Sequence, residues 1–132
     1  MLTAGEIMTP DMITVRPDVS IEDAIELLLR ERISGLPVID GDGQLVGVIT
    51  EFAMLAVAYD RRVKNHTVNQ HMTRELITVD VDDPVSRVAD LCIVHRVRRV
   101  PVMQNGRLVG VIARRDVLRA LVESPLESAC TA

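Results

Sequence analysis

Two similar stretches carry polar residues whose types and spacing suit ligand binding. The stretch GVITEFAML returns near the other end of the chain as GVIARRDVL, so the apolar frame repeats while the polar positions differ. The first has Thr50 and Ala53, whereas the second has Ala113 and Asp116. A carboxylate can accept hydrogen bonds from two adjacent hydroxyl groups, and a segment entering a helix offers free N–H groups to an anion. The pattern indicates binding of a polar ligand.

The other reactive side chains do not suggest catalysis or a metal. No nucleophile has an activating base at a recognisable spacing, and no paired carboxylates lie on a predicted loop, so we expect a protein that is not an enzyme. His66 and His71 are five residues apart and His95 ends a predicted helix. Because no i, i+4 histidine pair has a carboxylate partner, no zinc site is predicted. Cys92 is expected to fill the core.

Composition limits the classes of partner. The chain has 132 residues, of which 48% are hydrophobic and 26% charged, with a formal net charge of -4. The acidic balance and the scarcity of aromatic residues argue against nucleic acid as the main partner. No stretch is long enough to span a membrane, and two scattered cysteines suit a reducing compartment. We expect a soluble, unprocessed, cytoplasmic protein.

The chain contains an internal sequence repeat of two copies. A shift of 64 residues places Met8-Thr9 on Met72-Thr73 and also aligns the two Ile-Thr-Val runs. The segment LVGVI occurs in both copies at a shift of 63 residues, after a deletion of one residue in the preceding turn. So many matches in one register indicate an internal duplication, and this constrains the rest of the interpretation.

Each copy is predicted to form, in order, a strand, a helix, a strand, a turn, a strand and a helix. In the first copy, residues 13–15 favour a strand, and Ser20 with Asp23 forms a capping box that opens a helix ending near Arg32. Residues 36–39 and 45–49 are β-branched runs joined by a tight turn, and a helix is predicted from Glu51 to about Ala58.

The second copy repeats this order with different turn residues. Asp83 is predicted to be the N-cap of a helix with Pro84 at its first position. Strands at 100–103 and 108–112 flank Asn105-Gly106, which is a strong hairpin signal, and a last helix is predicted over 116–122.

These elements predict an α+β fold made of two pseudo-symmetric β-α-β-β-α repeats. Each repeat would form a small three-stranded mixed sheet with two helices, and the two would pack sheet to sheet about a pseudo-two-fold axis. We predict the first repeat at residues 1–60, a linker at 61–70, the second repeat at 71–122 and a C-terminal tail at 123–132.

With these repeated motifs, the sequence resembles a tandem pair of CBS domains, the cystathionine-β-synthase-type regulatory repeats also called a Bateman module. The resemblance covers roughly Met8 to Leu121. It rests on Met-Thr before the Ile-Thr-Val strand, on GLPVID and RVPVM around Pro37 and Pro101, and on the two glycine-led stretches. It implies two clefts between the repeats that bind adenine nucleotides or their relatives, dimerisation, and regulation of another protein.

The resemblance also implies which residues bind ligand. In the family pattern, the Asp of the glycine-led stretch accepts hydrogen bonds from the ribose, the hydroxyl residue three positions earlier reaches the phosphate, and the Pro-Val strand with the first Thr contacts the base. In the second copy the implied set is Thr78, Val97, Arg98, Arg99, Pro101, Arg114, Arg115 and Asp116. Ala113 departs from this pattern, and nearby arginines could meet the phosphate instead.

In the first copy the implied set is Thr14, Ile33, Ser34, Gly35, Pro37 and Thr50. Ala53 stands where the ribose-binding Asp is expected, so this cleft is predicted to bind weakly or not at all.

The leading hypothesis is a stand-alone sensor that binds AMP, ADP, ATP or a related ligand in the second cleft, without a required cofactor, and changes the shape of a homodimer. The regulated protein is unknown. One alternative is a degenerate scaffold that dimerises or docks without a small molecule. A second is binding of nucleic acid through Arg96, Arg98, Arg99, Arg114 and Arg115, which the net charge disfavours.

Overall fold

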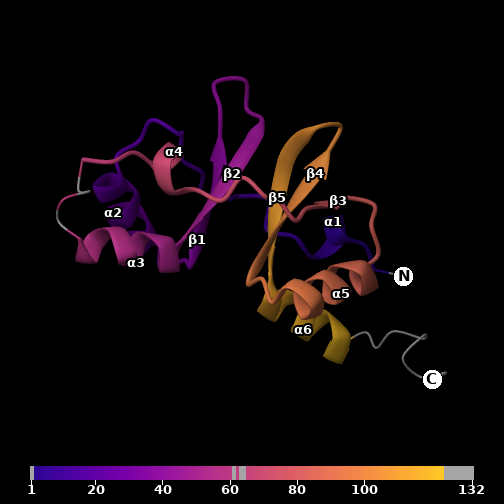
Figure 1. Ribbon diagram of the computed structural model, residues 1–132. Helices are drawn as coiled ribbons and strands as arrows, with labels where there is room; N and C mark the ends of the chain where they lie inside the picture. Colours follow the sequence, from indigo (N-terminus) through magenta and orange to yellow (C-terminus); the bar gives the residue numbers. More distant parts are fainter. Residues whose placement is uncertain (1, 61, 63–64, 124–132) are drawn as a thin grey trace. The chain divides into compact units, whose positions relative to one another are not determined.

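The computed structural model describes residues 2–60, 62 and 65–123, and it has an α+β fold with two small sheets (Figure 1). The chain forms two compact units. The first-copy unit contains Ile13–Leu76, and the second-copy unit joins the segment before Ile13 to the chain from Ile77 onward. Of the predicted tail, residues 124–132 lie outside the described part, as do residues 61, 63 and 64 of the predicted linker. Within the described residues, no helix is both long enough and apolar enough to cross a bilayer.

The first-copy unit is a β-hairpin with helices packed against it. Its elements are α2 (Ile21–Glu31), β1 (Gly35–Ile39), β2 (Leu45–Thr50), α3 (Glu51–Tyr59) and α4 (Val68–His71). β1 and β2 pair antiparallel, and α2 and α3 lie next to each other to the left of the hairpin in Figure 1.

The second-copy unit repeats this arrangement with one more strand. Its elements are α1 (Ala4–Ile7), β3 (Val79–Asp80), α5 (Val85–His95), β4 (Arg99–Gln104), β5 (Arg107–Ala113) and α6 (Arg114–Glu123). β4 pairs parallel with β3 and antiparallel with β5, which gives the predicted mixed three-stranded sheet.

The strand predicted at residues 13–15 is reduced to one parallel bridge, between Val15 and Val38. In the second copy, the N–H of Val81 donates to the carbonyl of Met103 at 2.9 Å and extends the parallel pairing. The equivalent residue in the first copy is Pro17, which has no N–H to donate. A single proline therefore explains why one sheet has two strands and the other three.

Helix ends and turns follow the predicted chemistry, with one correction. The Ser20 hydroxyl accepts a hydrogen bond from the N–H of Asp23 at 3.1 Å, which is one of the two bonds of the predicted capping box. Asn105 and Gly106 both have positive φ, at 52° and 79°, which suits the tight hairpin turn. The prediction for α5 was wrong by one residue, because Pro84 is the N-cap. The Asp83 carboxylate instead accepts from the N–H of Asp80 at 2.8 Å and closes the preceding turn.

Each unit has its own aliphatic core. Strand and helix residues such as Val100, Ile112 and Val88 fill the second-copy unit, while Leu36, Ile49 and Ile21 fill the first-copy unit. Full burial of such a side chain stabilises the fold by about 1.5–3 kcal/mol relative to its exposure. The apolar pattern that repeats in the sequence therefore builds two separate cores.

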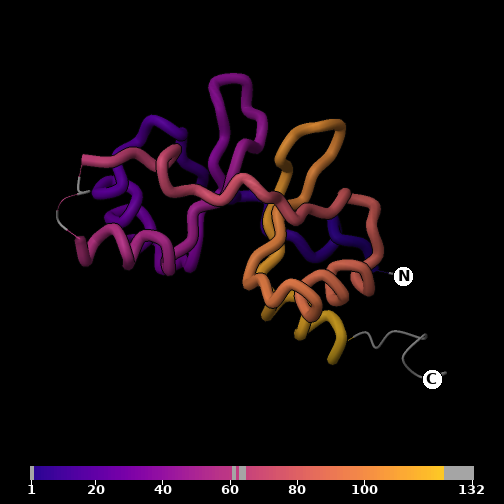
Figure 2. The backbone as a smooth tube through the Cα atoms, in the orientation of Figure 1, coloured from indigo at the N-terminus to yellow at the C-terminus, as the bar shows by residue number. Residues whose placement is uncertain are grey.

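Each Met-Thr segment covers the hairpin of the other sequence copy. Thr9 and Val111 exchange two backbone hydrogen bonds, of 2.9 and 3.1 Å, at the open edge of β5. Thr73 and Val48 do the same at the edge of β2, with bonds of 2.8 and 3.0 Å. Figure 2 shows the indigo N-terminal segment running beside the orange strands of the second copy. The segment before Ile13 is thus an integral part of the second-copy unit.

We predict that Gly47→Ala will destabilise the protein, because an added Cβ would lie 2.9 Å from the carbonyl oxygen of Thr73 and 2.7 Å from the sulfur of Met72. The methionine can move, but the paired backbone cannot, so the expected cost is about 1–3 kcal/mol of unfolding free energy. Urea denaturation followed by circular dichroism measures it. Gly41→Ala is the control, since only the Arg16 side chain lies near, at 3.5 Å. Equal midpoints for the two variants would contradict the tight packing at Gly47.

Candidate functional site

The Asp116 carboxylate lies at the start of α6, where the glycine-led stretch turns from strand into helix. Its Oδ2 accepts a hydrogen bond from the backbone N–H of Ala113 at 3.2 Å. Its Oδ1 forms an ion pair with Arg119 at 3.7 Å, and 22% of the side chain is exposed. At 3.7 Å this ion pair is too long to be a hydrogen bond. Oδ2 therefore fixes the orientation of the carboxylate, and Oδ1 retains the capacity to accept from a ligand.

The equivalent helix start in the first copy uses the opposite half of the same motif. The Thr50 hydroxyl accepts from the N–H of Ala53 at 3.2 Å and caps α3. In a complete capping box, the N-cap hydroxyl accepts from the third helical N–H, while the third side chain accepts from the N-cap N–H. Thr50 makes the first of these bonds and Asp116 makes the second. Each helix therefore has one of the two hydrogen bonds of a capping box, from Thr50 in the first copy and from Asp116 in the second.

A shallow groove lies beside Asp116 within the second-copy unit. It has a volume of about 390 Å³ and is lined by α1 and α6, through Leu2, Glu6, Ile7, Asp116, Arg119, Ala120 and Glu123. Apolar residues and carboxylates share its wall, with Arg119 as the cation. The N-terminal segment therefore contributes to the surroundings of Asp116.

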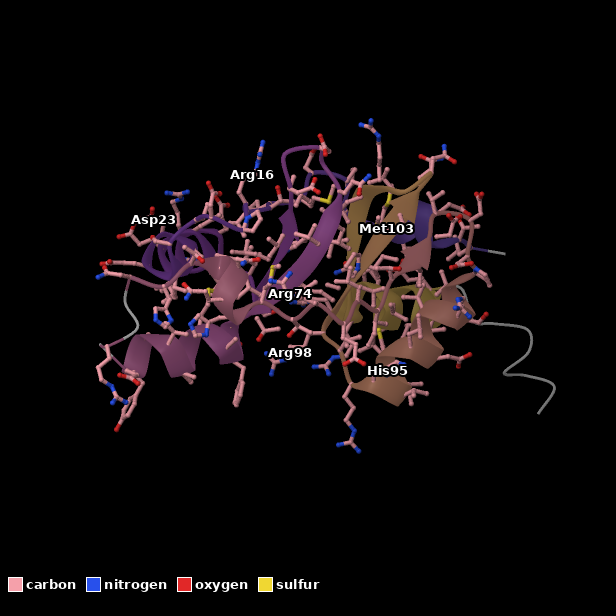
Figure 3. The ribbon with its side chains drawn as sticks, turned by 45° about the horizontal axis from the view of Figure 1, so that its top comes forward. Arg16, Asp23, Arg74, His95, Arg98 and Met103 are labelled. Carbon is pink, nitrogen blue, oxygen red and sulfur yellow. The ribbon has the colours of Figure 1, made fainter. Side chains whose placement is uncertain are left out.

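The candidate arginines lie around the same helix start. The N–H of Arg114 donates to the carbonyl of Arg98 at 2.8 Å, which ties the beginning of α6 to the residue preceding β4. Figure 3 labels Arg98. Arg99 begins β4, and Arg115 lines a surface hollow of about 280 Å³ along α6 that shares Arg119 and Glu123 with the groove beside Asp116. The structure thus brings the backbones of Arg98 and Arg114 together, whereas Arg115 lines the adjoining hollow.

The remaining second-copy candidates have clear structural surroundings. Thr78 is half-buried and directly precedes β3, while Val97 packs against the core of this unit. Pro101 is buried in β4 opposite Val111. All eight residues of the second-copy set therefore belong to one unit.

The first-copy set likewise belongs to one unit. The N–H of Glu51 donates to the carbonyl of Ser34 at 2.9 Å, repeating the tie between Arg114 and Arg98. Thr14 is half-buried, and Ile33 packs against the core. Gly35 and Pro37 are buried in β1, and Thr50 pairs with Gly35 at its end. The two candidate sets have the same backbone frame and differ in their polar side chains.

Cys92 is buried in α5, as expected for a core residue. Burial raises the pKa of its thiol, and the positive charge of Arg114 only partly opposes this. The thiol is therefore held in its less reactive neutral form.

Sequence reasoning missed the residues that α1 brings to the groove, namely Leu2, Glu6 and Ile7. One signal could have found them. Thr3 and Glu6 have the spacing of a capping box, and the N–H of Thr3 donates to Glu6 Oε1 at 3.0 Å.

Comparison with known proteins identifies both repeats. The sequence model of the CBS domain family matches residues 4–60 and 68–123. The chain is 31% identical over 116 residues to the uncharacterised protein MJ1225 of Methanocaldococcus jannaschii, covering 88% of this chain and 41% of that one. It is 34% identical over 117 residues to inosine-5'-monophosphate dehydrogenase of the same organism, covering 88% of this chain and 23% of the enzyme. The chain thus spans less than half the length of these relatives.

Solved structures share the fold over nearly their whole length. CBSX2 of Arabidopsis thaliana, crystallised in complex with AMP, superposes with a TM-score of 0.85 at 32% identity, covering 93% of this chain and 98% of the crystallised chain. The CBS domain pair of MJ0100, in complex with 5'-methylthioadenosine and S-adenosyl-L-methionine, gives a TM-score of 0.83 at 29% identity, with coverages of 93% and 98%.

We predict that Thr50→Ala will lower the free energy of unfolding by about 0.5–2 kcal/mol, because α3 loses its only half of the capping box. Thr50→Ser keeps the hydroxyl and should stay close to wild type. Chemical denaturation of both variants measures the difference. Indistinguishable midpoints for the Ala and Ser variants would show that the hydroxyl does not stabilise the helix.

Proposed function

The chain belongs to the CBS domain family, and we propose on this premise that it is a regulatory module that binds an adenine nucleotide or a related nucleoside. Binding would take place mainly through the second-copy residues and would alter a homodimer that another cytoplasmic protein recognises. We further propose that the module has no catalytic activity of its own.

The carboxylate of Asp116 is the observation that carries this proposal. It is mostly buried, its Oδ2 is held by the N–H of Ala113, and it lines the groove formed by α1 and α6. Ribose presents two adjacent hydroxyl donors, and a carboxylate accepts from such a pair with charge-assisted hydrogen bonds. Because Oδ2 already fixes the side chain, little conformational freedom is lost when the sugar binds.

The similar structures support an adenosine compound as the ligand. CBSX2 binds AMP, and the CBS pair of MJ0100 binds 5'-methylthioadenosine and S-adenosyl-L-methionine. All three ligands contain adenosine, and two of them carry no phosphate. The shared adenosine fits a site that is anchored by a sugar-binding carboxylate.

In the second copy, this chain differs from its family's pattern at the residue expected to contact the phosphate. Ala113 has no hydroxyl, and its N–H already donates to Asp116. Arg114, exposed in the first turn of α6, is the nearest replacement along the chain, because a guanidinium forms forked hydrogen bonds with phosphate oxygens. We therefore propose that either a nucleotide held through Arg114 or a nucleoside without phosphate binds here.

A second copy of the chain is the proposed partner of the exposed helix faces. Phe52, Leu55 and Tyr59 are 80%, 66% and 91% exposed along α3. Leu118 and Val122 occupy the equivalent face of α6 and are 64% and 73% exposed. Apolar faces of this kind mark interaction surfaces, and self-complementary contacts form most soluble dimers. The repeat of the same exposed face in both copies supports a homodimer.

A scaffold without a small-molecule ligand is the second candidate function. It is favoured because Thr50 and Asp116 are both engaged in helix capping. Under this alternative the polar residues serve stability alone, and the exposed apolar faces provide the function.

We predict that the chain binds AMP, 5'-methylthioadenosine or S-adenosyl-L-methionine, and that Asp116→Asn weakens binding by about 10- to 100-fold. Asparagine retains one oxygen for the helix cap but loses the charge, and hydrogen bonds to charged groups contribute about 1.5–3 kcal/mol. Isothermal titration calorimetry measures the affinities, and adenosine beside AMP reports the contribution of the phosphate.

Asp90→Asn is the matched control, since it removes the same charge from an exposed position on α5. It should bind like wild type. Absence of heat with all four adenosine compounds at millimolar concentration, from a folded sample, would reject the sensor and leave the scaffold.

We predict that the double variant Phe52→Glu/Tyr59→Glu will shift the protein from dimer to monomer, because four carboxylates would meet in the proposed interface. Sedimentation velocity over a range of concentrations measures the change. Arg107→Glu is the control, because it also changes the charge by two but lies exposed at the start of β5. A monomeric wild-type protein at high micromolar concentration would refute the proposed dimer.

A further inference from the structure

His66 and His71 face each other within the first-copy unit. His66 Nδ1 and His71 Nε2 are 2.8 Å apart. The ring centroids are 5.1 Å apart, with an angle of 20° between the ring planes. Both side chains are half-buried, so the pair is partly shielded from water. Two imidazole nitrogens at this distance share one proton, with one ring as the donor and the other as the acceptor.

The backbone holds both rings in place. The carbonyl of His66 accepts from the N–H of Ile21 at 2.9 Å, at the start of α2. His71 ends α4, whose first residue, Val68, is fully buried and whose N-cap, Thr67, donates its N–H to Gln70 Oε1 at 2.8 Å. Because His66 precedes the helix, a spacing of five residues brings the rings together, which the usual i, i+4 pattern does not reveal.

We propose that His66 and His71 form a binding site for a divalent transition-metal ion. Metal–nitrogen bonds of roughly 2.05 Å at right angles place two nitrogens about 2.9 Å apart, whereas a tetrahedral angle places them about 3.3 Å apart. The hydrogen-bonded separation of 2.8 Å is close to the separation of adjacent ligands of a tetragonal Cu²⁺ or octahedral Ni²⁺ ion, so the rings would have to turn but not to separate. A tetrahedral Zn²⁺ ion requires the rings to separate by a few tenths of an ångström.

Binding changes the positions of protons without changing their number. In the metal-free pair, the donating ring carries its proton on the nitrogen that faces its partner. For both lone pairs to point at the metal, the rings turn and that proton moves to the other nitrogen of the same ring. Because metals are coordinated by neutral imidazole, each ring in the complex has its lone pair on the metal and its proton on the other nitrogen.

Within the described part of the chain, the pair has no third ligand beside it. Hydrogen bonds from Arg62 are the main cause of the lowered pKa of the nearby Asp60 carboxyl group. The Asp60 carboxylate is engaged by the Arg62 guanidinium at 2.9 and 3.0 Å. No cluster of three or more His, Cys, Asp or Glu is found in the described part of the chain. Water would therefore complete the coordination, and the affinity should decrease from Cu²⁺ to Ni²⁺ and Zn²⁺.

The test is a titration of the untagged full chain, first treated with EDTA, with CuSO₄, NiCl₂ or ZnSO₄. Calorimetry should give one ion per chain, with Cu²⁺ bound most tightly, and electron paramagnetic resonance of the Cu²⁺ form should show nitrogen ligands. His66→Gln and His71→Gln should each weaken Cu²⁺ binding at least tenfold.

His95→Gln is the matched control, because His95 is the third histidine and ends α5 in the other unit (Figure 3). It should bind like wild type, and thermal melts in EDTA establish that every variant is folded. Absence of binding by wild type, or undiminished binding by both folded pair variants, would overturn the proposal. The adenosine-binding variant Asp116→Asn should keep its metal affinity, so the two proposals fail independently.

Discussion

The pairing of each exposed hairpin edge with a Met-Thr segment is the constraint on which the rest of the molecule depends. An unpaired edge strand leaves backbone donors and acceptors unsatisfied and available to other chains. Thr9 satisfies them at Val111, and Thr73 does so at Val48. Gly47 and Gly110 permit these close approaches, since a Cβ at either position would collide with the covering segment. Because the N-terminal segment is fixed in this way, α1 lies beside α6 and forms one wall of the groove at Asp116.

The same side chains that suit a ligand also stabilise helix ends, and this dual use explains the exchanged polar positions. A complete capping box needs a hydroxyl and a carboxylate three residues apart, and the family's ligand pattern needs the same two groups at the same spacing. Either half is enough to cap a helix. With Ala at position 53, α3 is capped by Thr50, and with Ala at position 113, α6 is capped by Asp116. Each side chain makes one of the two capping bonds, but their ligand chemistry differs, because an ionised carboxylate offers two oxygens for charge-assisted hydrogen bonds and a hydroxyl offers one neutral oxygen.

Sequence patterns predicted the features that arise from local chemistry. The repeat, the family and the α+β fold were confirmed, Asn105-Gly106 forms the predicted turn, and Ser20 caps α2 through the N–H of Asp23. What the patterns did not predict depends on contacts between distant segments. Helices of four residues such as α1 and α4 have no hydrophobic period, so the groove wall and the histidine pair were missed. Pro17 was not recognised as the residue that ends parallel pairing, because its effect depends on the missing partner bond to Ile39. The contacts of the site residues with ligand remain a prediction.

The two copies show how a duplicated fold can separate stability from recognition. Their cores share the same buried positions, for example Ile49 and Ile112, because every inward side chain must fill the space in its own unit. Ser34 and Arg98 each accept a backbone hydrogen bond from the first residue of the following helix, from Glu51 and Arg114 respectively. The same backbone contact therefore forms beside a hydroxyl side chain in one copy and a guanidinium in the other. The same fold thus carries a hydroxyl at position 50 in one copy and a carboxylate at position 116 in the other, and both helices are retained, so the polar character of the candidate site can differ while the backbone frame stays the same.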